Sequence, residues 1–270
     1  MNKNIYDFSK DYYLLWHDEF DGKKLDETKW NIVHGNFRVN NEAQRYTDGL
    51  NIELKDSCLV LWAKKEQFEG MEYTSARVNS RGKGDFTYGR IEICAKLPRG
   101  RGTWPALWMM GSTREYGGWP HCGEIDIMEH VGYNENVINT WFHTGSKNHV
   151  RQTQRGTRLF LDGACENFNV YAIEWYEDQI DVFYNNVLIY SLVKEENDTY
   201  LEWPFDKPHH IILNLAIGGN WGGAKGIDDS IFPCALYVDY VRVYDMTRDK
   251  DGNKRELTRR ADYDKGRNGL

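Results

Sequence analysis

Gly123 to His130, with the sequence Gly-Glu-Ile-Asp-Ile-Met-Glu-His, carries the pattern on which the fold prediction depends. Acidic and apolar residues alternate in it with the period of two that is typical of a β-strand with one buried face. Glu124 and Asp126 therefore point to the same face. Strict alternation would send Glu129 into the core, so we expect a β-bulge that absorbs one extra residue and returns Glu129 to the face of the other two acids.

Three carboxylates on one face indicate acid–base chemistry. Hydrolysis of a glycosidic bond needs two carboxyl groups, roughly 5 to 5.5 Å apart in a retaining enzyme, with one attacking the sugar and one protonating the leaving oxygen. Glu124 and Glu129 form the natural pair, with Glu129 as general acid and Asp126 orienting Glu124. Neighbouring like charges should keep at least one proton in the group. The alternative is a solvated edge strand, against which the preceding Trp-Pro-His-Cys sequence argues.

Composition narrows the class of partner. The 270 residues include 10 Trp, 17 Tyr and 11 Phe, and flat rings can stack on sugar faces as well as fill a β-sandwich core. The net charge is -7, with no basic stripe outside the last 26 residues, so nucleic acid is not expected as a partner. Acidic walls suit a neutral polymer better than an anionic one.

Cysteine usage and hydropathy give two further expectations. Five cysteines are widely spread without metal-ligand spacing, which favours free thiols and leaves one disulfide open. The longest apolar run near the start, Tyr12–Trp16, is too short for a membrane span or the apolar part of a signal peptide. We therefore expect no membrane span and no signal peptide in the chain as given.

Strand signals recur along the chain, and long helical periodicity is missing. The expected strands are residues 58–64, 74–80, 88–97, 122–129, 137–143, 170–176, 179–184, 187–192, 210–217 and 235–244. Asn185-Asn186 predicts a tight hairpin turn, because Asn tolerates positive φ. Many antiparallel strands joined by Gly and Asn loops favour an all-β fold, a jelly-roll β-sandwich of two antiparallel sheets, over a parallel α/β sheet.

No linker or internal repeat divides the chain before residue 244, so residues 1–244 are expected to form a single catalytic β-sandwich domain. Residues 245–270 carry 8 basic and 6 acidic side chains and almost no apolar ones. This composition predicts a disordered or loosely packed tail.

A succession of segments in consistent order resembles glycoside hydrolase family 16, and within it the laminarinase-like endo-β-glucanases. The matching segments are residues 16–22, 40–46, 73–77, 88–90, 97–109, 118–129, 213–221 and 237–244. The resemblance implies a jelly-roll sandwich with a concave substrate groove and a retaining double displacement. It also implies that Glu124 is the nucleophile, that Glu129 is the acid/base and that Asp126 assists them. The extra residue, here Met128, is shared by family members acting on β-1,3-glucans and on galactans. The chain departs from the family pattern at His121 and at Gly222-Gly223.

The resemblance also implies sugar-binding residues. These are Asn41, Arg77, Trp104, Trp108, Trp119, His143 and Trp221. For each Trp the alternative is packing in the core. Arg77 could instead brace Glu124, and His143 could be a structural residue. Gly218-Gly219 before Trp221 would let a sugar approach the backbone.

Many relatives bind one calcium ion far from the catalytic acids, and none needs a cofactor for catalysis. Glu19 and Asp239 match the family's calcium positions, and the Ser57 carbonyl is a candidate third oxygen ligand.

The leading hypothesis is therefore an endo-hydrolase of β-1,3-glucans such as laminarin, acting also on mixed-linkage β-1,3-1,4-glucans. One alternative is a non-catalytic β-glucan-binding protein, and another is a hydrolase of agarose- or porphyran-type galactans. The resemblance implies a secreted or cell-surface protein, and a monomer is expected.

Overall fold

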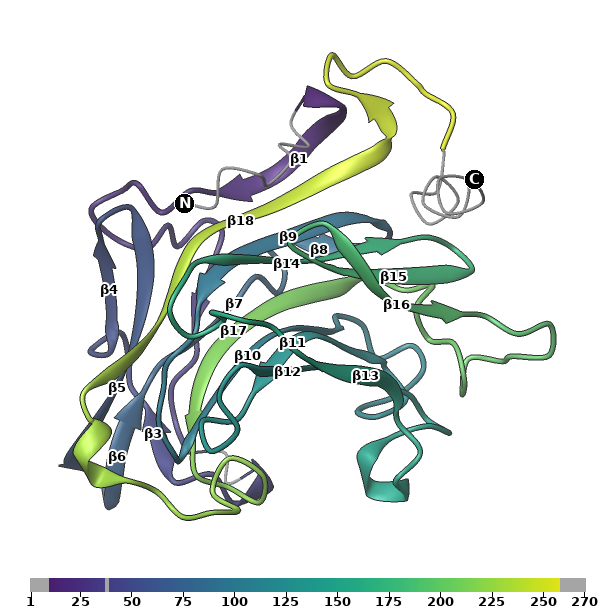
Figure 1. Ribbon diagram of the computed structural model, residues 1–270. Coiled ribbons are helices and arrows are strands. Elements are labelled where there is room, and N and C mark those ends of the chain that lie inside the picture. Colours follow the sequence, from purple (N-terminus) through teal and green to yellow (C-terminus); the bar gives the residue numbers. More distant parts are fainter. Residues whose placement is uncertain (1–9, 37–38, 258–270) are drawn as a thin grey trace.

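Two β-sheets stacked on one another form the protein (Figure 1). The structure, a computed structural model, describes residues 10–36 and 39–257. Within them the helical segments are short 3₁₀ turns, including η2 (Val39–Asn41), η3 (His149–Arg151) and η4 (Asp229–Ile231). All strand pairs are antiparallel except β3 with β6. The predicted all-β jelly-roll sandwich is confirmed.

The first sheet has ten strands. Its order is β16 (Val187–Val193), β15 (Gln179–Tyr184), β14 (Asn169–Trp175), β9 (Gly89–Lys96), β18 (Cys234–Asp249), β5 (Cys58–Phe68), β6 (Met71–Ser75) and β3 (Gln44–Tyr46), with β1 (Tyr12–Asp18) beside β18 and β4 (Ile52–Lys55) beside β5.

The second sheet has eight strands. Its order is β13 (Arg155–Phe160), β12 (Val137–His143), β11 (Glu124–His130), β10 (Thr103–Gly111), β17 (His209–Ile217), β7 (Arg77–Asn79) and β2 (Asn31–Ile32), with β8 (Asp85–Phe86) beside β17. This sheet bends, and the face turned away from the first sheet lies on the inside of the curve (Figure 1).

The main core lies between the two sheets and follows from alternation along each strand. Ile91 and Ile93 of β9 belong to the same buried cluster as Ile125 of β11 and Leu213 of β17, and all four side chains are fully buried. Because successive strand residues point to opposite faces, the residues between these apolar ones reach the outer faces of the sandwich. On β11 those intervening residues are the acids.

The five cysteines are all free thiols, as favoured by their spacing. Asn185 and Asn186 have φ values of 49° and 67°, which confirms the predicted hairpin turn between β15 and β16. No helix within residues 10–36 and 39–257 has the length and apolar character needed to cross a membrane.

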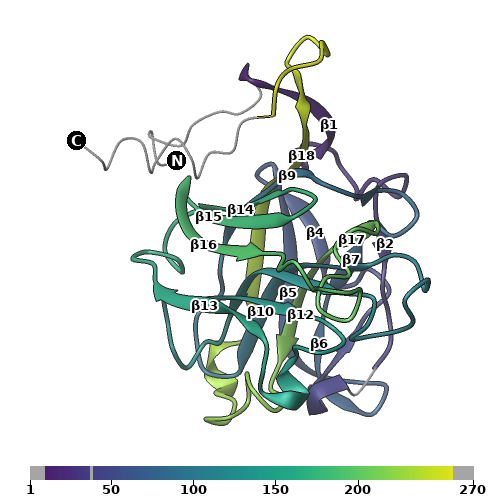
Figure 2. The ribbon, with the colours of Figure 1, turned by 90° about the vertical axis from the view of Figure 1, so that its right-hand side faces the viewer.

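The prediction of a disordered or loosely packed tail from residue 245 is wrong for residues 245–249, which belong to a strand. Strand β18 continues to Asp249, and its last part pairs with β1, so the two lie side by side (Figures 1 and 2). Arg255 donates a hydrogen bond to the Asp11 carbonyl at 3.1 Å, and its guanidinium lies 4.6 Å from the centre of the Tyr12 ring. Residues 258–270 of the predicted tail lie outside the described residues. That residues 1–244 form a single catalytic domain stays a prediction.

Candidate active site

The predicted bulge lies in β11 between the second and third acids. Asp126 is paired with Trp141 of β12 and Glu129 with Asn139, so two residues of β11 oppose one residue of β12. The ladder between β11 and β10 also shifts by one residue at this point. The bulge absorbs the extra residue, and the strand is regular on either side of it.

The two residues inside the bulge are Ile127 and Met128, and both side chains are fully buried in the core between the sheets. Met128 keeps a partner on β10, so the unpaired residue on that side is Ile127 and not Met128 as the sequence suggested. With two consecutive side chains in the core, Glu129 returns to the face that carries Glu124 and Asp126.

The three acids are deeply placed but reachable from solvent. The side chain of Glu124 is 14% exposed and that of Asp126 is 5% exposed. Burial, together with the charge of Asp126, raises the pKa of Glu124 to about 8, against the charge of His143, which lowers it. Burial and the same neighbouring charge raise the pKa of Glu129 to about 8, against a hydrogen bond from Trp104 that lowers it. Burial raises the pKa of Asp126 well above its usual range. The group therefore holds protons at neutral pH, as expected for adjacent carboxyl groups.

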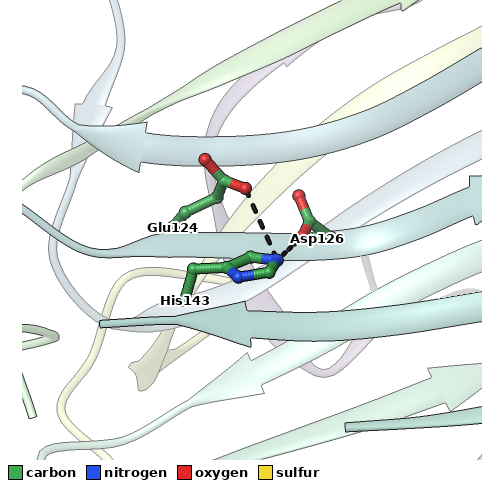
Figure 3. A group of neighbouring side chains, drawn as sticks. All are labelled: Glu124, Asp126 and His143. Carbon is green, nitrogen blue, oxygen red and sulfur yellow. Dashed lines mark ion pairs between the residues drawn. The ribbon is translucent and has the colours of Figure 1, made fainter. Parts of the chain in front are cut away.

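His143 of β12 lies directly across from Glu124 in the strand ladder and is buried beside the acids. Its Nε2 lies 3.2 Å from Asp126 Oδ2 and 3.7 Å from Glu124 Oε1 (Figure 3). Asp126 Oδ2 is buried and has no partner in good hydrogen-bonding geometry, although His143 Nε2 lies close to it. Ligand atoms of these three residues lie within 4.8 Å of one another, which is also an arrangement that could hold a metal ion.

Strand β10 supplies two of the predicted tryptophans. Trp104 Nε1 donates a hydrogen bond to Glu129 Oε1 at 2.9 Å, which fixes the position of that carboxyl group. Trp108 Nε1 donates to Asn214 Oδ1 at 2.7 Å. The guanidinium of Arg77 lies 5.0 Å from the centre of the Trp108 ring. Arg77 thus packs on an aromatic face at this site, in the geometry of a cation–π contact.

The remaining predicted binding residues lie outside the strands. The Trp119 ring lies 5.1 Å from that of His149 and 6.4 Å from that of His143, and Trp119 also lowers the pKa of Glu124 through a hydrogen bond. Trp221 packs edge-on against Trp104, with ring centres 5.5 Å apart. Glu124, Asp126 and Glu129 together form what we call the acid row. These contacts place Trp119 at the Glu124 end of this row and Trp221 at the Glu129 end. In the loop that carries Trp221, Asn220 Oδ1 accepts a 2.8 Å hydrogen bond from Asn41 Nδ2.

Sequence reasoning missed three residues of this site. Asn214 lies between two leucines in β17, a polar residue in apolar surroundings that could have been noticed. Glu42 accepts a hydrogen bond from Gln44 Nε2 at 2.7 Å, and its charge raises the pKa of Glu129. The backbone N–H of His149 donates a hydrogen bond to the ring of His143, and a contact made by the backbone cannot be predicted from a pattern of side chains.

The predicted calcium ligands lie apart from the acid row. Glu19 forms a two-pronged pair with Arg242, with oxygen-to-nitrogen distances of 2.8 and 2.7 Å. Burial raises the pKa of Asp239, and Arg242 lowers it. Because a guanidinium already satisfies both oxygens of Glu19, that carboxylate does not fit the role of a calcium ligand in this arrangement.

Comparison with known proteins agrees with the fold. The family model for glycosyl hydrolases family 16 matches residues 25–242. The "Beta-glucanase" of Rhodothermus marinus is 47% identical over 241 residues, covering 86% of this chain and 84% of the relative. The solved laminarinase from the same organism superposes with a TM-score of 0.84, at 45% identity, over 86% of this chain and 97% of that one.

A second curated relative acts on a different sugar. The "Keratan-sulfate endo-1,4-beta-galactosidase" of Sphingobacterium multivorum is 35% identical over 252 residues, and the match covers 90% of this chain but only 57% of the relative. Similarity to proteins with different substrates shows a shared family without fixing the sugar. From the match along most of its length and the carboxyl-bearing strand β11, the chain belongs to glycosyl hydrolase family 16.

Proposed function

We propose that the protein is a retaining endo-β-glucanase that cleaves internal linkages of β-1,3-glucans such as laminarin, and also of mixed-linkage β-1,3-1,4-glucans. The observation that carries the proposal is the bulge in β11, which turns Glu129 to the face of Glu124 with Asp126 between them. Double-displacement hydrolysis of a glycosidic bond needs two carboxyl groups flanking that bond. Strand β11 presents two such groups on one face, next to Trp104 and Trp119.

In the first step, the ionised Glu124 attacks the anomeric carbon of the sugar, and the glycosidic C–O bond breaks. Glu129 gives its proton to the departing oxygen, so the leaving sugar departs as a neutral alcohol. A pKa of about 8 keeps Glu129 protonated at neutral pH, as a general acid must be. The pKa of Glu124 is also about 8, so Glu124 must first lose its own proton before it attacks. The hydrogen bond from Trp104 holds Glu129 and supports its charge once the proton has left.

In the second step, the ionised Glu129 removes a proton from water, and the water oxygen attacks the anomeric carbon. The bond to Glu124 breaks, and the carboxylate is regenerated. His143 and Trp119 both lower the pKa of Glu124, so these contacts favour its ionised form before attack and after release. The covalent intermediate can also be intercepted by a sugar hydroxyl, which would give transglycosylation.

Support for a glucan substrate comes from the relatives named as a glucanase and a laminarinase, at 47% and 45% identity. A net charge of -7 also suits a neutral polymer. The presence of both Glu124 and Glu129 argues against a non-catalytic glucan-binding protein. A polymeric substrate would be met outside the cell, which is where we propose that the protein acts. Calcium is not part of the proposal, because Glu19 is paired with Arg242.

Digestion of four polymers tests this proposal. Laminarin, lichenan, barley glucan and agarose are incubated separately with the protein, and the products are separated by size while ¹H NMR follows the new reducing ends. We expect oligosaccharides of several lengths from laminarin, with the β-anomer appearing first. Glu124→Gln should release none of them. Products from agarose alone would assign a galactan substrate, and binding of laminarin without products would revive the binding-protein alternative.

A further inference from the structure

The buried imidazole of His143 contacts a backbone group on the side away from the acids. The backbone N–H of His149, the first residue of η3, donates a hydrogen bond to His143 Nδ1 at 3.2 Å. The opposite ring nitrogen, Nε2, faces Glu124 and Asp126 (Figure 3). The ring therefore bridges a backbone donor and a pair of carboxyl groups.

These two contacts determine where the ring carries its hydrogen. A backbone N–H can only donate, so Nδ1 must present its lone pair to it. The neutral imidazole then carries its hydrogen on Nε2, directed to the side of the carboxylates. The other tautomer would place two hydrogens against each other at Nδ1 and a lone pair beside the carboxylates at Nε2. The contact at Nδ1 would be unfavourable in any protonation state of the acids, and the contact at Nε2 would be unfavourable once Glu124 is ionised for attack.

The loop that presents the His149 N–H is itself held in place by a buried residue. Asn148 is 2% exposed, its Oδ1 accepts the Arg151 N–H at 3.2 Å, and its Nδ2 donates to the Thr144 carbonyl at 3.0 Å. These bonds cap η3 and tie it to the end of β12. The backbone donor thus comes from a fixed turn, which allows it to select one tautomer.

We propose that the backbone N–H of His149 is a positioning group that fixes the Nε2–H tautomer of His143, so that the imidazole presents a hydrogen to Glu124 and Asp126. The inference rests on the proposed function and deepens it. With the hydrogen directed to them, the positive end of the ring dipole lies beside the carboxylate that attacks the sugar. The same dipole stabilises this carboxylate when the covalent intermediate breaks down.

A proline at position 149 would remove this N–H with little other change. His149 is the first residue after the cap of η3, the helix position where proline is best tolerated. Asn148 has φ of -157° and ψ of 168°, the extended conformation that a residue before proline prefers. The matched control is His149→Ala, which also removes the ring that packs on Trp119 but keeps the N–H.

The first measurement reads the tautomer without any reaction. In ¹⁵N-labelled wild type and in His149→Ala, the ring nitrogens of His143 should show a protonated Nε2 and an unprotonated Nδ1 at neutral pH. His149→Pro should show a mixture of both tautomers. A wild-type spectrum with the hydrogen on Nδ1 would overturn the proposal by itself, whatever the fate of the variants and whatever substrate the enzyme takes.

The second measurement compares hydrolysis of laminarin. Loss of one hydrogen bond that selects a tautomer should lower kcat of His149→Pro about fivefold relative to His149→Ala, with KM unchanged. Equal kcat values in the two variants, with unfolding temperatures matched, would contradict a positioning role. Absence of hydrolysis by the wild type would instead count against the proposed function, and the tautomer spectrum would remain decisive for the inference.

Discussion

Trp104 and Glu129 are joined by a hydrogen bond of 2.9 Å from the indole Nε1 to the carboxyl Oε1. This bond lowers the pKa of Glu129 against the larger effect of burial. In Trp104→Phe the donor is lost, so the pKa of Glu129 should rise further above its usual range. The alkaline limb of the kcat/KM profile on laminarin should then move up by about half to one pH unit.

The matched control for this prediction is Trp108→Phe, which removes an indole N–H that donates to Asn214 and not to an acid. Its alkaline limb should stay at the wild-type position. A limb that moves to lower pH in Trp104→Phe would contradict the assignment of Glu129 as the proton donor.

Deletion of Ile127 tests the role of the bulge. Without this residue, Asp126 and Glu129 would be separated by one residue, and the ladders with β10 and β12 would become regular. All three acids would still share a face, so we expect a folded protein with reduced but measurable activity. The loss of one buried side chain should lower the free energy of unfolding by about 2–5 kcal/mol, measured in urea.

Deletion of Ile125 is the contrasting variant, because it removes the same residue type from the same strand. It leaves Glu124 and Asp126 adjacent, and adjacent strand residues point to opposite faces. This variant should have no activity on laminarin. Comparable activities in the two deletion variants would show that the common face of the acids is not what the reaction needs.

Glu124→Gln should stabilise the protein, and more so at alkaline pH. The pKa of Glu124 is about 8 in the folded protein against a reference of 4.5, so the native state binds the extra proton between these values. Wild-type stability therefore falls as pH rises through this window, whereas an amide carries no such penalty. We expect the variant's advantage to be small at pH 4.5 and to reach roughly 2 kcal/mol, or about 5 °C in Tm, above pH 8.

The control for the stability prediction is Glu196→Gln, a change of the same kind at an exposed position. Its unfolding temperature should follow the wild type at every pH. If the stability advantage of Glu124→Gln instead grew as the pH fell, folding would have to lower the pKa of Glu124, which contradicts the raised pKa described here.

Removal of divalent metals should leave the protein unchanged. Glu19 is satisfied by Arg242, and the Nε2 of His143 carries a hydrogen in the proposed tautomer and so offers no lone pair to a metal. EDTA should therefore shift Tm by less than about 1 °C, since an ion that does not bind the native state cannot stabilise it. A fall of several degrees that calcium reverses would restore the calcium hypothesis.

Arg242→Gln is the variant that sharpens the metal prediction. It leaves Glu19 without its charged partner near Asp239, whose pKa the charge of Glu19 raises. Two neighbouring carboxylates without a cation repel each other, so this variant should be less stable than the wild type. Calcium should then raise its Tm while leaving that of the wild type unchanged.

The common face of Glu124, Asp126 and Glu129 could be predicted from the spacing of the three acids. Strict alternation would separate Glu129 from the other two, so a shared catalytic face required a bulge between Asp126 and Glu129. Strand β10 was not predicted, because Pro105 interrupts its pattern. In the structure, Pro105 has a partner on β17 but none on β11, whose pairing with β10 begins at Ala106. A proline is tolerated at such a position because one side of the ladder has already ended.

Two other features could not be predicted from side-chain patterns. The end of β18 is rich in charge and resembles a tail, but it is ordered by pairing with β1, which is far away in the sequence. The contact of His149 depends on a backbone N–H, a group that nearly every residue has. The turn held by Asn148 is what directs the N–H of His149 to Nδ1 of His143.

Strand β11 lies inside its sheet, with β10 on one side and β12 on the other, whereas Trp119 and Trp221 belong to loops. Backbone amides of β11 should accordingly exchange with deuterium slowly, and those of the two loops quickly. Loops accept insertions and replacements that an interior strand does not. Evolution can therefore change which polymer the protein accepts by substitutions in the loops of Trp119 and Trp221, while the carboxyl groups on β11 stay the same.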